Sequence, residues 1–351
     1  MRDTIYYWKC DRPAALHGVR ARPPGEDVAL IPQLHDLLTP HFRAPLQLRS
    51  GKGHGNHKTY LLEYPQGNAF IRVEDGPEGD GHLEVESRVI NVVAAVGVPV
   101  PKVLFTDASR LQVPFVVQVI EYIEAPDLNS LHQKGLLELR AIARVIGRSI
   151  ARWQEVAVAG FGPFQADCID SLRGYHSDYE TYFFLHLDRH LSLLEAHELL
   201  SHHETDGIRH CFDRHRPHLR LKQGVLVHKD LALWNIMGAP ESIRAFIDWD
   251  DAIAGDPLDD LSLLACFHSP EIVQAALEGY AEVRPLPIPF ETRFQLHLLR
   301  NMIVKAVIRC EAGYFELPAG GSFLMGAEQD GRSLRHFTRE RLMSAYEELR
   351  Q

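Results

Sequence analysis

Hydrophobic positions between residues 47 and 123 come in short runs that Gly, Pro and Asp separate. Such runs predict β-strands joined by turns. The strands are expected over 60–64, 69–73 and 115–120. One helix is predicted over 83–96, because valines recur there at helical spacing until Gly97 and Pro99 end the pattern. This part of the chain is therefore expected to form a small, β-rich domain.

From residue 136 onward the pattern becomes helical, since apolar residues follow a period of about 3.6 residues. The helical segments are expected around 139–153, 178–200, 258–281 and 290–312. Two short strand-like segments, 224–227 and 245–247, lie between these helices. A linker is expected near 124–129, where Pro126 and Asp127 break the pattern. We therefore predict an α+β protein with an N-terminal extension of unassigned role (1–46), a β-rich domain (47–124) and a mostly helical domain (125–351).

Composition narrows the class of protein. The chain has 351 residues, of which 45% are hydrophobic, so each of two domains can bury a core. A formal net charge of -10 disfavours a broad nucleic-acid surface, which would have to be basic. The five cysteines form no CxxC pair, and no signal peptide or membrane-spanning run is present. We therefore expect a cytoplasmic protein without nucleic-acid or membrane partners.

The segment from His228 to Asn235 follows the pattern H-x-D-x-x-x-x-N, and a short apolar strand ends at Asp248. Phosphoryl transfer requires a hydroxyl placed in line with the γ-phosphorus and neutralisation of the spreading negative charge, usually by magnesium. Asp230 can face the hydroxyl, while Asn235 and Asp248 can hold Mg²⁺ through oxygen atoms. Taken singly, the three residues could equally be a turn residue, a cap and a strand end. Together they favour phosphoryl transfer.

Two segments carry a family resemblance, VLVHKDLALWNIM (225–237) and FIDWDDAIAGDPLDDLSLL (246–264). They resemble the aminoglycoside phosphotransferase and choline kinase-like family of small-molecule kinases, and the resemblance runs from about residue 47 to 314. It implies a two-lobed protein-kinase-like fold with a small β-rich N-lobe and a larger helical C-lobe. By the same resemblance Asp230 would be the catalytic base, Asn235 and Asp248 would ligate magnesium, and His228 would brace the loop.

Asp256 and Asp260 also match family positions, and for both we favour a structural role over a chemical one. Asp256, followed by Pro257, can cap the next helix, and Asp260 can accept hydrogen bonds from the loop around His228.

The N-terminal domain offers a candidate phosphate-covering loop at 49–58, where glycines let backbone amides approach a phosphate. A glycine-rich hairpin turn is the alternative explanation. The candidate nucleotide-binding residues of this loop are Gly51, Gly53, Gly55 and Asn56.

Arg72 on a predicted buried strand needs a partner or a phosphate, and it is the candidate phosphate ligand. Glu86 in the next helix is expected to form the ion pair that positions it, with Glu84 as the competitor. The resemblance further places the purine against the backbone of the hinge and against an apolar side chain of the C-lobe. These remaining nucleotide-binding residues are Glu121, Tyr122, Ile123 and Ile247.

The loop departs from the family pattern at Lys229, where family members often have Gly. A cation at this position could lower the pKa of Asp230, contact a phosphate or meet an anionic substrate. It argues against a purely cationic aminoglycoside as the acceptor.

The first functional hypothesis is a small-molecule kinase that transfers the γ-phosphoryl group of ATP or GTP to a hydroxyl of an antibiotic (aminoglycoside- or macrolide-like), sugar or amino alcohol. Its partners would be the nucleotide, Mg²⁺ and that acceptor, and the sequence gives no indication of oligomeric state. A protein kinase is disfavoured, because Asp248 is followed almost at once by Gly255-Asp256-Pro257 and leaves little room for an activation loop. The alternatives are a nucleotide-binding pseudokinase that acts as an interaction module and a kinase of another metabolite.

Overall fold

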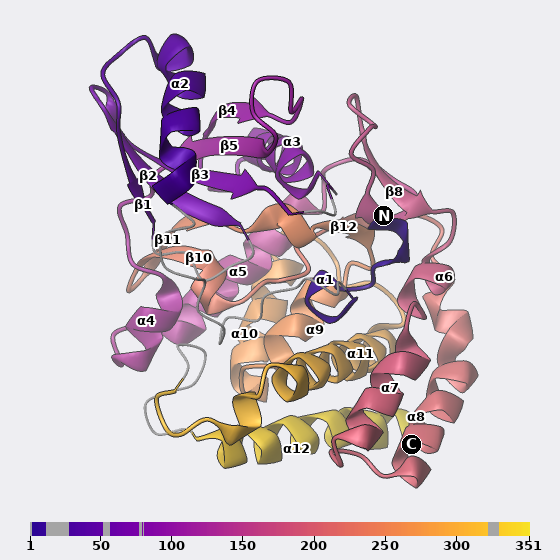
Figure 1. Cartoon of the computed structure of the whole chain (residues 1–351). Helices are drawn as coiled ribbons and strands as arrows, with labels where there is room; N and C mark the ends of the chain where they lie inside the picture. The colour runs from indigo at the N-terminus through magenta and orange to yellow at the C-terminus, as the bar shows by residue number, and fades with distance from the viewer. Residues whose placement is uncertain (1, 12–27, 52–56, 77–78, 80, 322–329) are drawn as a thin grey trace.

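The computed structural model describes residues 2–11, 28–51, 57–76, 79, 81–321 and 330–351. Figure 1 shows a β-rich N-lobe, drawn at the top, above a larger C-lobe built mostly of helices. The predicted α+β, two-lobed architecture is confirmed.

The N-lobe is built on a five-stranded antiparallel sheet in the order β1-β2-β3-β5-β4. Its elements are η2 (Val28–Leu30), α2 (Ile31–Phe42), β1 (Gln47–Ser50), β2 (Lys58–Tyr64), β3 (Gly67–Glu74), α3 (His82–Ala95), β4 (Val103–Asp107) and β5 (Val116–Glu121). Alternation along β3 turns Ile71 and Val73 into a core that they share with Leu34 of α2. It turns Arg72 to the other face, where α3 lies. The strand β4 and the helix α2 were not predicted.

Helices dominate the C-lobe, where the 22-residue α11 is buried along most of its length between neighbouring helices. The helices α5 and α10 approach so closely that a Cβ on Gly147 would lie 1.8 Å from the carbonyl oxygen of Ala276. The helices are α4 (Leu128–Gln133), α5 (Leu139–Trp153), α6 (Tyr179–Phe183), α7 (Leu187–Ala196), α8 (His202–His215), η3 (Arg216–Leu219), α9 (Asp259–Ala265), α10 (Pro270–Ala281), α11 (Phe290–Glu311), η6 (Tyr314–Glu316) and α12 (Gly331–Arg350). Periodicity predicted α5, α9, α10 and α11, whereas α8 and α12 were missed.

Short strands in the C-lobe hold the predicted catalytic segments. A second five-stranded sheet has the order β6-β8-β7-β12-β9, and β10 pairs with β11 in a hairpin. The elements are β6 (Val158–Ala159), β7 (Phe161–Phe164), β8 (Leu172–His176), β9 (Val225–Val227), η4 (Leu233–Asn235), β10 (Ile236–Ala239), β11 (Ser242–Phe246), η5 (Trp249–Asp251) and β12 (Ile253–Gly255). The two predicted segments correspond to β9 and β11, but β6, β7 and β8 were not predicted.

The N-terminal segment does not stay on the surface. It forms η1 (Arg2–Thr4) and α1 (Trp8–Asp11), and α1 lies near the middle of the molecule, where it contacts α11 (Figure 1). Its side chains from Ile5 to Trp8 are all at least nine-tenths buried. The segment is therefore part of the folded core, not a tail.

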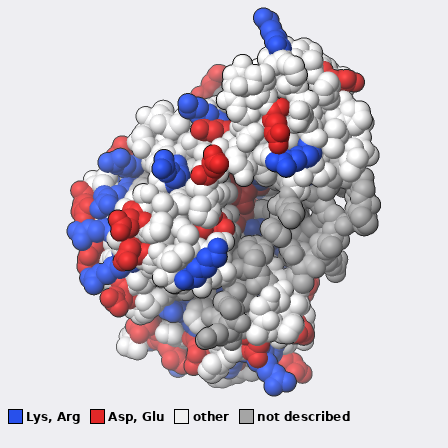
Figure 2. All heavy atoms as spheres, turned by 90° about the vertical axis from the view of Figure 1, so that its left-hand side faces the viewer, with Lys and Arg blue, Asp and Glu red and all other residues white. Residues whose placement is uncertain are grey.

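The described residues show neither a single-sign charged patch on the face in Figure 2 nor a disulfide. On the face shown in Figure 2, acidic and basic side chains are interspersed over the lower part of the molecule. Within the described ranges, no helix combines the length and the apolar character that crossing a membrane requires. All five cysteines are free thiols.

Candidate active site

The loop between β9 and β10 holds Asp230 and Asn235 together. Asp230 is 2% exposed, and the Asn235 side-chain amide donates to the Asp230 backbone oxygen at 2.8 Å and to its Oδ2 at 3.2 Å. Since these bonds use the amide nitrogen of Asn235, its carbonyl oxygen can still bind a metal ion. The local turn thus places a carboxylate and a neutral oxygen ligand side by side.

Asp260 at the start of α9 supports this loop from below. Its carboxylate accepts hydrogen bonds from the backbone N–H of His228 at 2.8 Å, from that of Lys229 at 3.0 Å and from the Trp153 indole at 3.2 Å. Burial raises the pKa of Asp260 to about 6, although His228 and the backbone donors oppose this shift. The His228 Nε2 atom lies 3.0 Å from the backbone oxygen of Ile247, and its ring packs at a tilt against Trp249, with centroids 4.3 Å apart. His228 therefore links the loop to the segment that carries Asp248.

Asp256 does not cap the next helix as expected. The N-cap residue of α9 is Leu258, and no side chain caps this helix. Asp256 instead accepts a hydrogen bond from the Leu258 N–H at 2.9 Å and pairs with Arg293 of α11 at 2.7 Å. A turn of two residues separates Asp256 from the helix start, which is why the capping prediction was wrong.

Asp248 follows β11 with a left-handed backbone (φ 68°), and its side chain is 33% exposed. Mg²⁺ commonly binds one or two protein oxygens and takes its other ligands from water and phosphate. The Asp248 carboxylate and the Asn235 carbonyl fit that donor set. In the part of the chain that the structure describes, no three His, Cys, Asp or Glu side chains group into a metal site of their own.

A buried charge network joins the two lobes at Arg72. Its guanidinium contacts Glu86 at 2.5 Å, Asp248 at 2.9 Å and Asp250 at 3.0 Å. Glu86, not Glu84, makes the pair, and it also accepts a hydrogen bond from the Trp249 N–H at 3.0 Å. Burial raises the pKa of Glu86 to about 7 despite the opposing charge of Arg72.

Asp250 was not recognised in the sequence as a site residue. It is 4% exposed, and its carboxylate also contacts His57 at 3.1 Å. Burial alone would raise its pKa, but Arg72 and His57 hold the pKa of Asp250 well below its usual range. The spacing Asp248-Trp249-Asp250 is the signal that could have indicated it.

The predicted nucleotide residues of the N-lobe are only partly described. Gly51 donates its N–H to the Thr59 carbonyl at 2.7 Å, which holds the end of β1 against β2. Gly53, Gly55 and Asn56 lie outside the described residues.

Not every backbone group of the hinge residues is available to bond a purine. The Glu121 N–H bonds the Lys102 carbonyl at 2.8 Å, so this donor is not available to a purine. Tyr122 is 42% exposed, Ile123 is half-buried, and Ile247 in the C-lobe is half-buried as well. A purine-binding role is therefore restricted to the remaining backbone groups of this segment.

The N-terminal segment reaches Asp230, a contact that the sequence did not predict. The Tyr7 hydroxyl donates to Asp230 Oδ1 at 2.7 Å, and the Lys9 ammonium lies 2.9 Å from Oδ2. Lys305 of α11 adds a third contact, 3.1 Å from Oδ1. Burial alone would raise the pKa of Asp230, but the two lysines and the Tyr7 hydrogen bond hold it far below its usual range.

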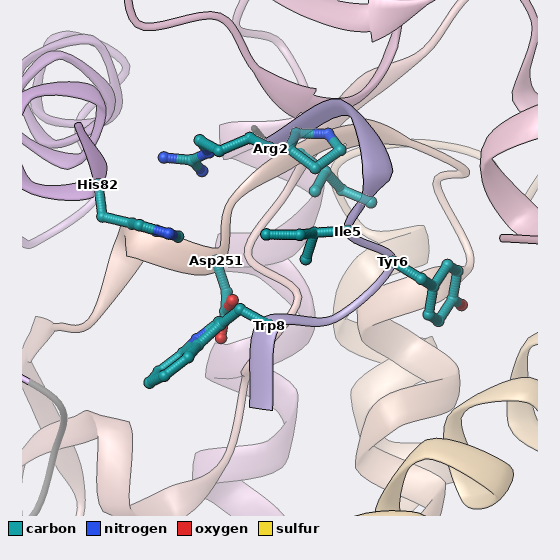
Figure 3. A pocket seen from close by; sticks show the side chains of 8 residues that line it. Arg2, Ile5, Tyr6, Trp8, His82 and Asp251 are labelled. Carbon is teal, nitrogen blue, oxygen red and sulfur yellow. The ribbon is translucent and has the colours of Figure 1, made fainter. Parts of the chain in front are cut away.

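Several contacts fix the N-terminal segment in this position. Figure 3 shows Arg2, Ile5 and Trp8 packed beside His82 and Asp251, with Tyr6 pointing to the other side. Tyr6 lies under the Arg300 guanidinium, 3.7 Å from the ring centroid, and stacks on Tyr182. Asp11 accepts hydrogen bonds from the backbone N–H groups of Tyr6 and Tyr7, and its carboxylate pairs with Arg189 and His190.

The Lys229 side chain points away from Asp230, although the sequence suggested that it could lower the pKa of Asp230, contact a phosphate or meet an anionic substrate. Its backbone is left-handed (φ 72°), and its ammonium points to Asp259 at 2.7 Å and to the Tyr6 hydroxyl at 3.2 Å. The side chain is 2% exposed. The cations beside the candidate base are Lys9 and Lys305.

The comparisons with known proteins agree with this arrangement. The profile of the phosphotransferase enzyme family (APH) matches residues 49–290. The chain belongs to the phosphotransferase enzyme family. It is thus a phosphotransferase whose acceptor is a small-molecule hydroxyl, as predicted. A search of curated protein sequences found no match.

Solved structures of phosphotransferases share the fold. A thermostable mutant of the aminoglycoside phosphotransferase APH(4)-Ia has a TM-score of 0.62 at 16% identity, over 89% of this chain and 98% of that one. A variant of the same enzyme in complex with AMP-PNP and hygromycin B gives 0.61 at 15% identity, over 90% and 98%. A fructosamine-3-kinase candidate from Thermobifida fusca gives 0.59 at 18% identity, over 89% and 98%.

Proposed function

We propose that this phosphotransferase moves the γ-phosphoryl group of ATP or GTP to a hydroxyl of a small molecule, with Asp230 as the base. The observation that supports this most directly is the 2.7 Å hydrogen bond that Asp230 accepts from the Tyr7 hydroxyl. An acceptor hydroxyl needs the same kind of bond. Because Lys9, Lys305 and the Tyr7 hydrogen bond hold the pKa of Asp230 far below its usual range, its carboxylate is ionised and can accept a hydrogen bond from the acceptor hydroxyl.

In the proposed step, the acceptor oxygen bonds to the γ-phosphorus while the bond between that phosphorus and the β–γ bridging oxygen breaks. The nucleoside diphosphate leaves with that electron pair, and the acceptor proton goes to Asp230. Mg²⁺ would neutralise phosphate charge, and we assign Asn235 and Asp248 as its protein ligands. Arg72, positioned by Glu86, would contact the nucleotide phosphates. His228 and Asp260 would hold the loop, and Asp256 would fix the turn before α9.

We assign nucleotide binding to residues 47–124 and catalysis with acceptor binding to residues 125–351. The loop with Gly51, Gly53, Gly55 and Asn56 would cover the phosphates. The hinge backbone and Ile247 would hold the purine. The free thiols fit a reducing compartment, so we also propose a cytoplasmic location.

A screen for nucleotide consumption tests this function. Purified protein with Mg²⁺ and either ATP or GTP is offered aminoglycosides, macrolides, sugars, amino alcohols and hydroxy acids, and release of the diphosphate is measured. Release that an acceptor stimulates and that Asp230→Asn abolishes supports the proposal. One observation favours the alternative of a nucleotide-binding module without transfer: Tyr7, Lys9 and Lys305 already occupy both oxygens of Asp230. Nucleotide binding with no Asp230-dependent release for any acceptor would support that alternative.

Magnesium dependence should follow Asp248. In the Asp248→Asn protein we expect nucleotide affinity in the presence of Mg²⁺ to fall by about tenfold or more, because a charged oxygen ligand is lost. Affinity measured without metal should change little. Titration calorimetry with and without Mg²⁺ checks this, and Asp107→Asn at the half-buried C-terminal end of β4 serves as the control. An unchanged magnesium effect would rule out Asp248 as a ligand.

Tyr7 should compete with the acceptor, because its hydroxyl occupies the carboxylate oxygen that the acceptor needs. We expect Tyr7→Phe to raise kcat/KM for the acceptor by roughly tenfold, the equivalent of one hydrogen bond to a charged group. Tyr6→Phe is the matched control, since the Tyr6 hydroxyl contacts Lys229 and not Asp230. A fall in kcat/KM for Tyr7→Phe would show instead that this hydroxyl assists transfer.

A further inference from the structure

A cavity of about 200 Å³ lies directly beside the candidate catalytic loop. It opens between that loop and the helices α4, α11 and α12. A cavity of roughly 150 Å³ can hold benzene, so this one has room for a ring with a substituent. Aromatic side chains form much of its wall, and they come from three different segments: Trp234, Phe267 and Phe337.

Arg309 of α11 lines the same cavity. It is a buried cation, and few neighbouring groups offset its positive charge. It is 8% exposed, and its guanidinium makes one hydrogen bond, from Nη1 to the Thr338 hydroxyl at 2.7 Å. Burial lowers the pKa of Arg309 to about 10, and the ionisable groups that oppose this shift are Cys266 and Tyr314, not a carboxylate. Within the described ranges, Arg309 has no ion-pair partner. A guanidinium with five N–H donors in this position favours an anion.

The rest of the cavity wall does not neutralise Arg309. Arg341 of α12 lies 5.5 Å from the ring centroid of Phe337 and donates to the His268 backbone oxygen at 3.3 Å. The His268 ring also lines the cavity, and burial together with His132 and Arg341 lowers its pKa to about 4. His268 is therefore neutral at pH 7. The described part of the wall combines aromatic surface with positive charge.

A series of side-chain contacts leads from the cavity wall to Asp230 through Phe267 and Lys305. The Lys305 ammonium lies 3.1 Å from Asp230 Oδ1 and 5.7 Å from the Phe267 ring centroid. Phe267 in turn packs edge-on against Trp234, with centroids 5.2 Å apart. Lys305 is one turn before Arg309 on α11, so the two cations lie on the same side of that helix.

We propose that this cavity is the acceptor site, and that the acceptor is an organic anion with a ring and a hydroxyl. Arg309 binds its carboxylate or phosphate group, the three aromatic side chains cover its ring, and its hydroxyl is directed toward Asp230. This inference rests on the proposed function, because it assigns the cavity to the phosphoryl acceptor. It distinguishes this chain from an enzyme for polycationic acceptors, since a cationic group would meet Arg309 and Lys305.

Three carboxylates at α6 and α11 do not offset this preference for an anionic acceptor. Asp178 caps α6 through the Thr181 N–H, Glu180 pairs with Arg216 at 2.8 Å, and Glu311 pairs with His197 at 2.9 Å. Each carboxylate therefore has a structural partner of its own.

A matched set of ligands on one scaffold tests the proposal by binding alone. The probes are benzyl alcohols that carry a carboxylate, a phosphate ester, a carboxamide or an aminomethyl group at the para position, and ligand-observed NMR gives their affinities for the full chain. We expect the carboxylate or the phosphate ester, or both, to bind at least about tenfold more tightly than the amide and the amine. Their relative affinities distinguish the two kinds of anion.

The variant Arg309→Met should remove this preference while nucleotide binding is retained, and Arg152→Met on the exposed side of α5 should keep it. Equal affinities for anion, amide and amine, no binding of either anion, or an unchanged preference in Arg309→Met would each overturn the proposal. Because these measurements need no turnover, they fail independently of the kinase proposal, which depends on Asp230-dependent diphosphate release.

Discussion

Replacement of Asp230 by Asn is expected to lower kcat by about 10²- to 10⁴-fold, the usual contribution of a general base. Asn retains the size of the side chain and can still accept the hydrogen bond from the Tyr7 hydroxyl. It cannot take the acceptor proton. Nucleotide affinity should stay within a small factor of the wild type, since Asp230 is not assigned to the nucleotide or the metal.

Single-turnover kinetics with the acceptor found in the screen measure this effect. Asp36→Asn, at an exposed position of α2, controls for the loss of one negative charge. The melting temperature of the Asp230→Asn protein shows whether the fold survives the loss of a partner for Lys9 and Lys305. A folded Asp230→Asn protein with ordinary turnover would eliminate Asp230 as the base.

Asp259→Ala should cause the largest loss of stability, because it leaves the Lys229 ammonium buried without its carboxylate. Lys229 and Asp259 are 2% and 1% exposed and lie 2.7 Å apart. Removing one partner of such a buried pair costs about 3–5 kcal/mol in the free energy of unfolding. The Tyr6 hydroxyl and Asn301 near the ammonium are neutral and cannot replace the lost charge.

Urea unfolding distinguishes the cost of an unpaired buried charge from the cost of lost packing. The four proteins compared are the wild type, Asp259→Ala, Lys229→Met and the double variant Lys229→Met/Asp259→Asn. We expect the double variant to recover most of the loss, because a neutral pair leaves no unpaired charge behind. Asn at 259 keeps an oxygen that can accept the hydrogen bond from Asn301. If the double variant is as unstable as Asp259→Ala, the cost comes from lost packing instead.

Local sequence patterns were sufficient for much of the N-lobe and for the chemical groups of the catalytic loop. The valine repeat predicted α3 to within one residue at each end. The spacing of His228, Asp230 and Asn235 indicated the groups for phosphoryl transfer, and the structure places the Asn235 amide within hydrogen-bond distance of Asp230. Such features depend on residues fewer than ten positions apart, so they are visible in the sequence.

Other helices and strands were not predicted, because their sequence patterns are weak. The strands β6 and β7 have only two and four residues, too few to show alternation. The helix α2 contains Pro40, which reads as a helix breaker, yet its leucines pack on the sheet and the helix ends soon afterwards. In both cases tertiary packing supplied what local propensity did not.

The amino-acid sequence by itself determined which groups are available for phosphoryl transfer: a carboxylate, an amide oxygen and a second carboxylate at set intervals. Only the tertiary structure decided what surrounds them. It brings Tyr7 and Lys9 to Asp230 from more than two hundred residues away, turns Lys229 toward Asp259, and leaves Arg309 facing an aromatic cavity. The physical reason is that spacing along the chain sets backbone geometry over a few residues, whereas the partner of a buried charge depends on which distant segments pack against it.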